Sequence, residues 1–293
     1  MKRHPFLTGF AFMLVVCLLF VAIVWGVTKF NLTDTISSGS AEKVAVIEVE
    51  GIISASRETI ERIHTLRDDA SIKAVVLRID SPGGTVGPAQ EIYEELIKLQ
   101  KHKPVVASMG SVAASGGYYI AAGTQKIFAN PGTITGSIGV LIEVANFEEL
   151  LGKIGLRSEV IKSGQFKDTL SPARTMETDE RSLIQAVIDN IHNQFVDAIA
   201  KGRSMPREKV LALADGRILS GEQALEAGLV DELGNLYDAI QAAANMAGIE
   251  DKPEVAYPKE KKPSLLDFII GTQLQTILEQ RKGGVTAEYI MFR

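Results

Sequence analysis

Two glycine-rich junctions, each between a strand-like run and a helix-like run, constrain the fold of this 293-residue chain most strongly. At the first, the apolar run 73–80 breaks at Ser-Pro-Gly-Gly, residues 81–84, and residues 88–100 have a helical pattern. At the second, the run 104–109 leads into Ala-Ser-Gly-Gly, residues 114–117, and helix-compatible residues follow. This alternation predicts βαβ units that build an α/β fold with a largely parallel sheet.

Ser115 lies in the second junction. A serine at the start of a helix has an exposed hydroxyl, nearby free backbone N–H groups and the positive field of the helix N-terminus. These are the requirements of a serine nucleophile. The alternative interpretation is a tight packing turn of small residues, because a serine beside two glycines is a weak motif when taken alone.

The first junction supplies what a serine nucleophile needs next to it. Two consecutive glycines after a strand adopt backbone geometry closed to other residues, so their N–H groups can face a ligand. Strand–Ser-Pro-Gly-Gly–helix followed by strand–Ala-Ser-Gly-Gly–helix resembles the Clp-protease/crotonase superfamily, whose fold is built from repeated ββα units. The resemblance implies an oxyanion hole made by the N–H groups of Gly84 and Gly116, with Gly83 as the less favoured donor.

Three further stretches select a branch of this superfamily. Residues 132–140, 163–172 and 215–224 are similar, in order and spacing, to motifs of the signal peptide peptidase A family in its short, single-domain form. The similarity covers residues 43–247. It implies a membrane-anchored serine endopeptidase that degrades remnant signal peptides and other short apolar peptides after their release from preproteins.

A serine nucleophile needs a base, and histidine is the usual one. The chain has four histidines: His4, His64, His102 and His192. None of them belongs to the motifs, so a histidine triad is not expected. The family resemblance implies that Lys167 is the general base and that Ser137 orients its amine. A lysine base must be neutral, which requires the absence of a close carboxylate; Asp168 is expected to point to the opposite side of an extended segment.

The N-terminal residues predict a membrane anchor. Residues 6–27 carry no charge, and as a helix they would span about 33 Å, enough for a bilayer core. A cleavable signal peptide is less favoured, because this run is long and no small-x-small cleavage site follows closely. Lys2 and Arg3 place the N-terminus in the cytoplasm, which puts the catalytic domain on the periplasmic or extracellular side; Lys29 weakens the opposite orientation without removing it.

The remaining composition limits the function classes. The net charge of −5 offers no basic footprint for nucleic acid, and Cys17 is the only cysteine, so no intrachain disulfide can form. No clustered histidine and cysteine set calls for a metal, and no cofactor is expected. The predicted organisation has four parts: an anchor at 1–30, a tether at 31–42, a protease domain at 43–250, and a C-terminal part at 251–293. The last part contains a linker at 258–263, an amphipathic helix at 265–278 and a mobile tail at 283–293.

Three alternative functions stay open at this stage. A crotonase-type acyl-CoA enzyme shares the oxyanion hole, but an exported domain would not meet CoA. An inactive membrane-anchored scaffold is disfavoured by the presence of both Ser115 and Lys167. A related membrane Ser/Lys protease that acts on membrane proteins or misfolded exported proteins is not separated from the first choice, because substrate choice depends on the shape of the pocket.

The segment between the two predicted catalytic residues suggests an assembly. It is expected to contain a helix at 147–154 and a strand at 158–161, which is long enough to reach a neighbouring subunit. The family resemblance implies a homo-oligomeric ring or dome with heterologous contacts, in which one subunit can complete its neighbour's site. We therefore expect Ser115 of one subunit to pair with Lys167 of the next.

Overall fold

The structure, a computed structural model, describes residues 13–14, 18–19, 42–257 and 288–290, and the chain divides into a unit at Met1–Ala41 and a unit at Glu42–Arg293. Within these described residues, no helix is long and apolar enough to cross a membrane. Only four residues of the predicted anchor are described. The predicted linker at 258–263 and the amphipathic helix at 265–278 lie outside the described residues.

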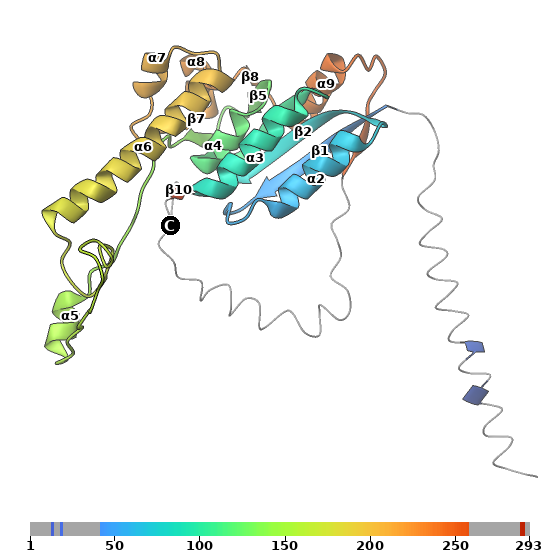
Figure 1. Cartoon of the computed structure of the whole chain (residues 1–293). Helices are drawn as coiled ribbons and strands as arrows, with labels where there is room; N and C mark the ends of the chain where they lie inside the picture. Colours follow the sequence, from blue (N-terminus) through green and yellow to red (C-terminus); the bar gives the residue numbers. More distant parts are fainter. Residues whose placement is uncertain (1–12, 15–17, 20–41, 258–287, 291–293) are drawn as a thin grey trace, which may run out of the picture. The chain divides into compact units, whose positions relative to one another are not determined.

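An eight-stranded sheet forms the centre of the second unit (Figure 1). Six strands follow the order β7-β6-β4-β2-β1-β9, while β5 pairs with β4 and β8 pairs with β5. All these pairs are parallel except that of β6 and β7. The predicted α/β fold with a largely parallel sheet is confirmed. The strands are β1 (Lys43–Glu50), β2 (Ile72–Ser81), β4 (Val105–Ala114), β5 (Lys126–Ala129), β6 (Ile134–Gly136), β7 (Ile218–Ser220), β8 (Glu232–Leu233) and β9 (Glu254–Ala256).

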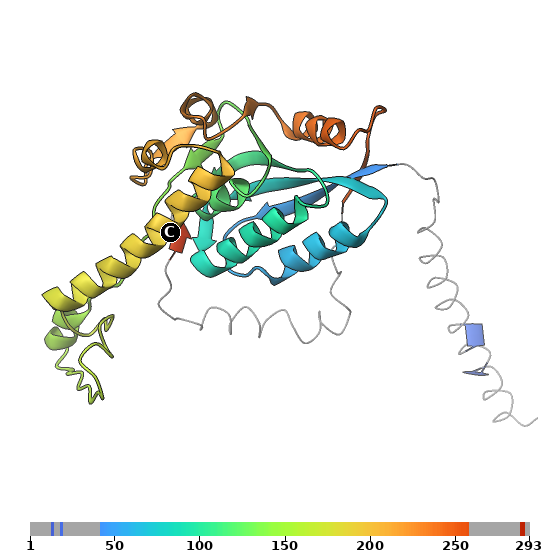
Figure 2. The same ribbon diagram turned by 45° about the horizontal axis from the view of Figure 1, so that its top comes forward.

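Helices cover both faces of this sheet, as Figure 2 shows most clearly. Helices α2 (Arg57–Asp68) and α3 (Val86–Leu99) pack on one face, and α9 (Leu236–Met246) packs on the other. Successive residues of β1 serve the two layers in turn, with Ile47 in the first hydrophobic cluster and Val46 in the second. A parallel strand buried on both faces reads as a continuous apolar run, which is why the sequence pattern predicts it well.

The short helix α4 (Gly116–Ala121) is buried along its whole length. The ring of Tyr119 packs edge-on against Tyr93 of α3, with ring centroids 5.1 Å apart, and against Phe195 of α6 (Thr178–Gly202) at 4.9 Å. Burial raises the pKa of Tyr119 to about 12. Three helices are therefore locked together directly behind the Ala-Ser-Gly-Gly junction.

Residues 141–187, which we call the arm, are built differently. They comprise a long loop, α5 (Glu148–Lys153) and the first part of α6, and both views place α5 at the end of α6 that lies away from the sheet (Figures 1 and 2). Only Thr169 and Glu180 of the arm are buried. The predicted helix at 147–154 is confirmed.

The predicted strand at 158–161 is wrong, because this segment has no regular secondary structure. A strand needs a neighbour to accept and donate its backbone hydrogen bonds, and a local apolar pattern does not supply one. Ile161 is 96% exposed and Val160 is 48% exposed, so the side chains that suggested the strand do not pack on the described part of the chain.

The rest of the domain closes the sheet near its β7 edge. The third family motif, residues 215–224, contains β7 and the first turn of α8 (Gly221–Ala227). Ser220 caps α8, since its hydroxyl accepts the N–H of Gln223. Helix α7 (Arg207–Leu211) connects this region to the end of α6.

A second, two-stranded sheet joins distant parts of the chain. Strand β3 (Gly83–Thr85) pairs in antiparallel register with β10 (Glu288–Ile290). Residues 288–290 of the predicted tail thus pair with β3, while the mobility of the tail stays a prediction. The physical reason for the pairing is the free edge of β3, which offers unpaired backbone groups to any extended segment that reaches it.

Candidate active site

Ser115 lies at the strand-to-helix junction, between the end of β4 and α4. Its backbone has φ 53° and ψ −115°, a conformation that costs a non-glycine residue of order 1–3 kcal/mol. The surrounding backbone fixes this geometry: the Ser115 N–H donates to the carbonyl of Gly136 at 2.8 Å, and its carbonyl accepts the N–H of Tyr119 at 2.8 Å. The expected exposed hydroxyl is wrong for this chain, because these backbone contacts hold the residue in the core, where it is only 1% exposed. A strained, fully held serine at such a turn fits a nucleophile better than a packing residue.

The Ser-Pro-Gly-Gly loop is held by Ser81, which is buried. The Ser81 hydroxyl donates to the carbonyl of Gly51 at 2.6 Å, and it accepts the N–H of Gly83 at 3.1 Å. Gly83 has φ 106°, which only glycine adopts readily. At Gly84, an added Cβ would lie 2.2 Å from the carbonyl oxygen of Ile53. The Gly83 N–H is thus engaged within the loop, while Gly84 pairs with Tyr289 of β10 and bridges Ile53, so the choice between the two glycines as oxyanion donor stays a prediction.

The two glycine-rich junctions lie against each other. Ser81 at the end of β2 pairs with Ala113 at the end of β4. A Cβ on Gly117 would lie 2.8 Å from the carbonyl oxygen of Ser81, so the backbones approach as closely as glycine allows. Gly84 and Gly116 thus belong to adjoining loops, which is the arrangement that a two-loop oxyanion hole requires.

Ser137 also lies close to the nucleophile. It follows Gly136, whose carbonyl binds the Ser115 N–H, and its own N–H donates to the carbonyl of Arg217 at 2.7 Å. Its φ of 50° is a second strained non-glycine conformation at this site. Ser137 lines a cavity of about 380 Å³, together with Gly216 and residues of α6. Ser115 itself is not among the residues that line this cavity.

His192 of α6 lines the same cavity, a placement that sequence reasoning missed. Its Nε2 is buried and has no hydrogen-bond partner among the described residues. Helical spacing in the sequence could have indicated this placement. His192 lies one turn before Phe195, which packs on Tyr119 behind the junction. A histidine beside this cavity is a rival to Lys167 as the base.

Lys167 lies in the arm and is exposed. The segment around it consists of turns: the Lys167 N–H donates to the carbonyl of Gly164 at 3.2 Å, and the Ser171 N–H donates to that of Asp168 at 2.9 Å. The expected extended segment is therefore wrong. Asp168 is nevertheless engaged elsewhere, because its carboxylate binds Lys162 and Arg174.

One chain does not bring Ser115 and Lys167 together. The residue after Lys167 is tied through Arg174 to Glu180 near the start of α6, whereas the part of α6 that packs beside α4 begins at Phe195. The helix between these two points is about 22 Å long. Within the described part of the chain, neither the Ser115 hydroxyl nor the Lys167 amine has a hydrogen-bond partner. The chain thus holds a candidate nucleophile and a candidate base, and it does not bring the two together.

Strand β3 is part of the Ser-Pro-Gly-Gly loop, and β10 pairs along its edge. In the antiparallel pairing, Tyr289 lies opposite Gly84 and Ile290 lies opposite Gly83. Ile53 forms a parallel bridge with Gly84 on one edge of β3, and β10 pairs with the other edge. An extended backbone therefore binds next to the predicted oxyanion donor.

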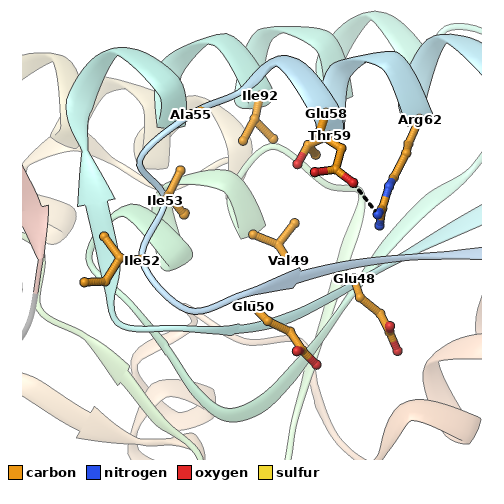
Figure 3. Close-up of a pocket in the computed structure, with 10 residues that line it drawn as sticks. All are labelled: Glu48, Val49, Glu50, Ile52, Ile53, Ala55, Glu58, Thr59, Arg62 and Ile92. Atoms are coloured by element: carbon orange, nitrogen blue, oxygen red, sulfur yellow. Dashed lines mark hydrogen bonds and ion pairs between the residues drawn. The ribbon is translucent and has the colours of Figure 1, made fainter. Parts of the chain in front are cut away.

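A cavity of about 240 Å³ lies between the end of β1 and the start of α2 (Figure 3). Val49 points toward α2, while Glu48 and Glu50 point to the other side of the strand (Figure 3). Glu58 and Arg62 of α2 form an ion pair at 2.6 Å along its wall. Unlike the cavity at Ser137, it is lined by none of the predicted site residues, so it is not part of the candidate site.

Comparison with known families supports the interpretation of the two junctions. The profile described as "Peptidase family S49" matches residues 97–250, and the profile described as "Clp protease" matches residues 33–136. The first includes Ser115, Ser137 and Lys167, and the second includes both glycine-rich junctions.

Three relatives are similar over most of this chain. A Synechocystis sp. protein named "Putative protease slr0021" is 46% identical over 245 residues, which are 83% of this chain and 88% of that protein. An Enterococcus faecium protein named "Putative signal peptide peptidase SppA" is 35% identical, over 78% of this chain and 70% of its own. "Protease 4" of Haemophilus influenzae is 36% identical, over 70% of this chain and 35% of its own. The chain belongs to peptidase family S49, and it is a serine peptidase similar to signal peptide peptidase A.

Proposed function

We propose that this peptidase is a membrane-anchored endopeptidase that uses a Ser115–Lys167 dyad to degrade remnant signal peptides after their release from preproteins. The observation that carries the proposal is the separation of the two unpartnered residues, with the strained serine in the core and the exposed lysine on the arm. A second copy of the chain can supply what each one lacks.

The second copy would come from a homo-oligomeric ring or dome, and the apolar surface of the arm supports such an assembly. Its exposed large apolar side chains are Leu141, Phe147, Leu150, Ile154, Leu156, Val160, Ile161, Phe166, Leu183 and Val187. A heterologous contact that covers this face would bring the arm's Lys167 toward the cavity at Ser137 of the neighbour. Ser137 would then orient the incoming amine.

The chemistry is acyl transfer. Neutral Lys167 takes the proton of the Ser115 hydroxyl, whose oxygen bonds to the peptide carbonyl carbon, and the N–H groups of Gly84 and Gly116 stabilise the resulting oxyanion. The C–N bond then breaks, and the Lys167 ammonium returns the proton to the leaving amine. In the second half, Lys167 takes a proton from water, the hydroxide attacks the ester, and Ser115 leaves with that proton.

The substrate class follows from the β3 edge and from the apolar N-terminal run. An extended peptide that adds a strand to β3, as β10 does, would present its backbone to the predicted oxyanion donor. Anchoring through residues 6–27 would keep the enzyme beside the bilayer in which cleaved apolar peptides remain. The name of the Enterococcus faecium relative agrees with this class.

The main alternative is a related membrane Ser/Lys protease that acts on membrane proteins or misfolded exported proteins. It has the same dyad, and the two functions differ only in the substrate. A crotonase-type acyl-CoA enzyme is disfavoured, because the S49 profile covers both predicted catalytic residues.

The direct experiment is labelling with a fluorophosphonate probe, followed by digestion of a synthetic signal peptide in lipid vesicles. We expect the wild type to be labelled and to fragment the peptide, and Ser115→Ala to do neither. Rapid digestion of a misfolded exported protein, with the signal peptide left intact, would support the alternative.

Membrane orientation is tested separately, with a reporter fused after Arg293. If the anchor is inserted with Lys2 and Arg3 inside, the reporter is active only outside the cytoplasm. A reporter active in the cytoplasm would reverse the proposed localisation in the cytoplasmic membrane and redirect the search to intracellular substrates.

A further inference from the structure

Asp168, the residue next to the candidate base, lies at the centre of a set of ion pairs. Its carboxylate accepts hydrogen bonds from Nε and Nη2 of Arg174, both at 2.9 Å, and from Nζ of Lys162. The side chain is only 12% exposed. These hydrogen bonds, those from Arg174 first, hold the pKa of Asp168 well below its usual range. Asp168 is thus a charged carboxylate whose charge two cations compensate.

The same guanidinium binds the start of α6. Nη1 of Arg174 donates to Oε2 of Glu180 at 2.8 Å, and Nη2 donates to the other carboxylate oxygen. Glu180 is buried, and it accepts the N–H of Glu177 at 2.9 Å, which closes the capping box of α6. The hydrogen bonds from Arg174 lower the pKa of Glu180 to about 2. The carboxylate that Arg174 binds, that of Glu180, therefore belongs to the first turn of α6.

Arg174 also reaches the backbone beside the lysine. Nη2 donates to the carbonyl of Asp168 at 3.1 Å, and Nη1 donates to that of Thr175 at 3.1 Å. One planar group thus connects the residue after Lys167 to the first turn of α6. A lysine at position 174 would keep the charge but would lack the fork that reaches two carboxylates at once.

Among the described residues, the lysine segment has one other side-chain link to the first turn of α6, the hydrogen bond from the neutral amide of Gln165 to the carboxylate of Asp179 at 2.6 Å. Residues 164–171 are turns on an arm whose side chains are mostly exposed, and the chain has no regular secondary structure between α5 and α6. Without Arg174, both the position and the protonation state of Lys167 would change. An uncompensated Asp168 carboxylate favours the protonated lysine, which cannot accept a proton.

We propose that Arg174 is a positioning residue of the peptidase: it fixes the direction in which Lys167 projects from the arm, and it compensates the charge of Asp168 beside the base. The inference rests on the proposed Ser115–Lys167 dyad. The charged groups that surround Asp168 from the loop, from α5 and from the start of α6 are Lys162, Arg174, Glu148, Glu177, Asp179 and Glu180.

The experiment measures kcat, KM and the pH of half-maximal kcat for three variants of the assembled enzyme. Arg174→Lys keeps the charge and loses the fork, so kcat should fall roughly 10- to 100-fold at unchanged KM, with the pH midpoint unmoved. Arg174→Gln should lose kcat similarly and also move the midpoint up by roughly half a unit to one unit. Adding Asp168→Asn to Arg174→Gln should return the midpoint, but not kcat, toward the wild type.

Arg207→Gln is the matched control, because Arg207 also pairs with a carboxylate of α6, that of Asp197, but far from the lysine segment. It should change neither quantity. Light scattering and circular dichroism report whether each variant assembles and folds. If Arg174→Lys does not, Glu180→Gln removes the ion pair with Arg174, while its amide oxygen can still accept the N–H of Glu177 in the capping box, and it should give the same fall in kcat.

Two results would overturn the inference. One is wild-type kcat and pH midpoint in an assembled Arg174→Gln enzyme. The other is loss of assembly in both Arg174→Lys and Glu180→Gln, which would make the cluster structural. Lys167→Ala is measured beside them. If Lys167→Ala stays active, the proposed dyad is wrong. If Lys167→Ala is inactive but the Arg174 variants behave like the wild type, only the inference about Arg174 is wrong.

Discussion

The core that holds Ser115 and the arm that holds Lys167 are built on different principles. In the core, apolar side chains from β1, β2 and β4 pack under helices on both faces, and the backbone around Ser115 is hydrogen-bonded on every side. In the arm, only Thr169 and Glu180 are buried, while apolar side chains face outward. The strained backbone of Ser115, the candidate nucleophile, depends on the first environment. A surface that presents a side chain to another molecule needs the second.

The largest expected effect comes from removing either member of the pair. Ser115→Ala should lower kcat by about 10³-fold or more, because a methyl group fits where the hydroxyl was but cannot attack a carbonyl. Lys167→Ala and Lys167→Arg should be equally inactive, since a guanidinium does not release its proton at working pH. Peptide cleavage assays measure this. Substantial turnover by Lys167→Arg would show that Lys167 is not the general base.

The next effect concerns the outward-facing side chains of the arm. Changing Leu150 and Ile154 together to Asp should disassemble the oligomer and lower activity at least about 10-fold, because charges would enter the contact that buries them. Analytical ultracentrifugation measures the assembly. Glu149→Gln, on the same helix, is the control and should leave assembly intact. If the double variant assembles normally, the arm does not form the contact.

A smaller effect is expected at the edge of the core. Removing residues 285–293 should free the β3 edge that β10 occupies and lower KM several-fold, with kcat nearly unchanged. Steady-state kinetics on a synthetic peptide measures this change. The excised segment, added back as a free peptide, should inhibit competitively. Unchanged KM and no inhibition would show that substrates do not bind along β3.

The smallest effect is expected for His192, which shares the cavity with Ser137. If Lys167 is the base, His192→Ala should change kcat by less than about 3-fold, because its ring takes no proton during catalysis. The measurement is kcat at several pH values. A loss comparable to that of Ser115→Ala would make the enzyme a Ser/His peptidase that completes its site within one chain.

The sequence predicted the core well and the arm poorly, for the same physical reason. The strands at Val105–Ala114 and Ile72–Ser81 are buried on both faces, so their apolar residues pack where the pattern says they should. The apolar residues at 158–161 find no partner in the described part of the chain, so a pattern typical of a strand has nothing to pair with.

The candidate site follows the same division. The positions of Ser115, Gly84, Gly116 and Ser137 near one another depend on the sheet, and the motifs in the sequence anticipate them. The turned conformation at Lys167 and the ion pairs of Arg174 depend on contacts between residues six apart in an irregular loop, for which no periodic pattern exists. The approach of β10 to β3 is a pairing of two very short segments far apart in the chain.

The central claim, that Ser115 of one subunit works with Lys167 of another, is tested most directly by mixing Ser115→Ala and Lys167→Ala subunits that carry different affinity tags. Tandem purification then isolates oligomers that contain both. With random mixing of equal amounts, about one quarter of the heterologous interfaces combine an intact serine with an intact lysine, so about one quarter of the wild-type activity should return. Mixed oligomers that carry both tags and remain inert would mean that each dyad forms within one chain.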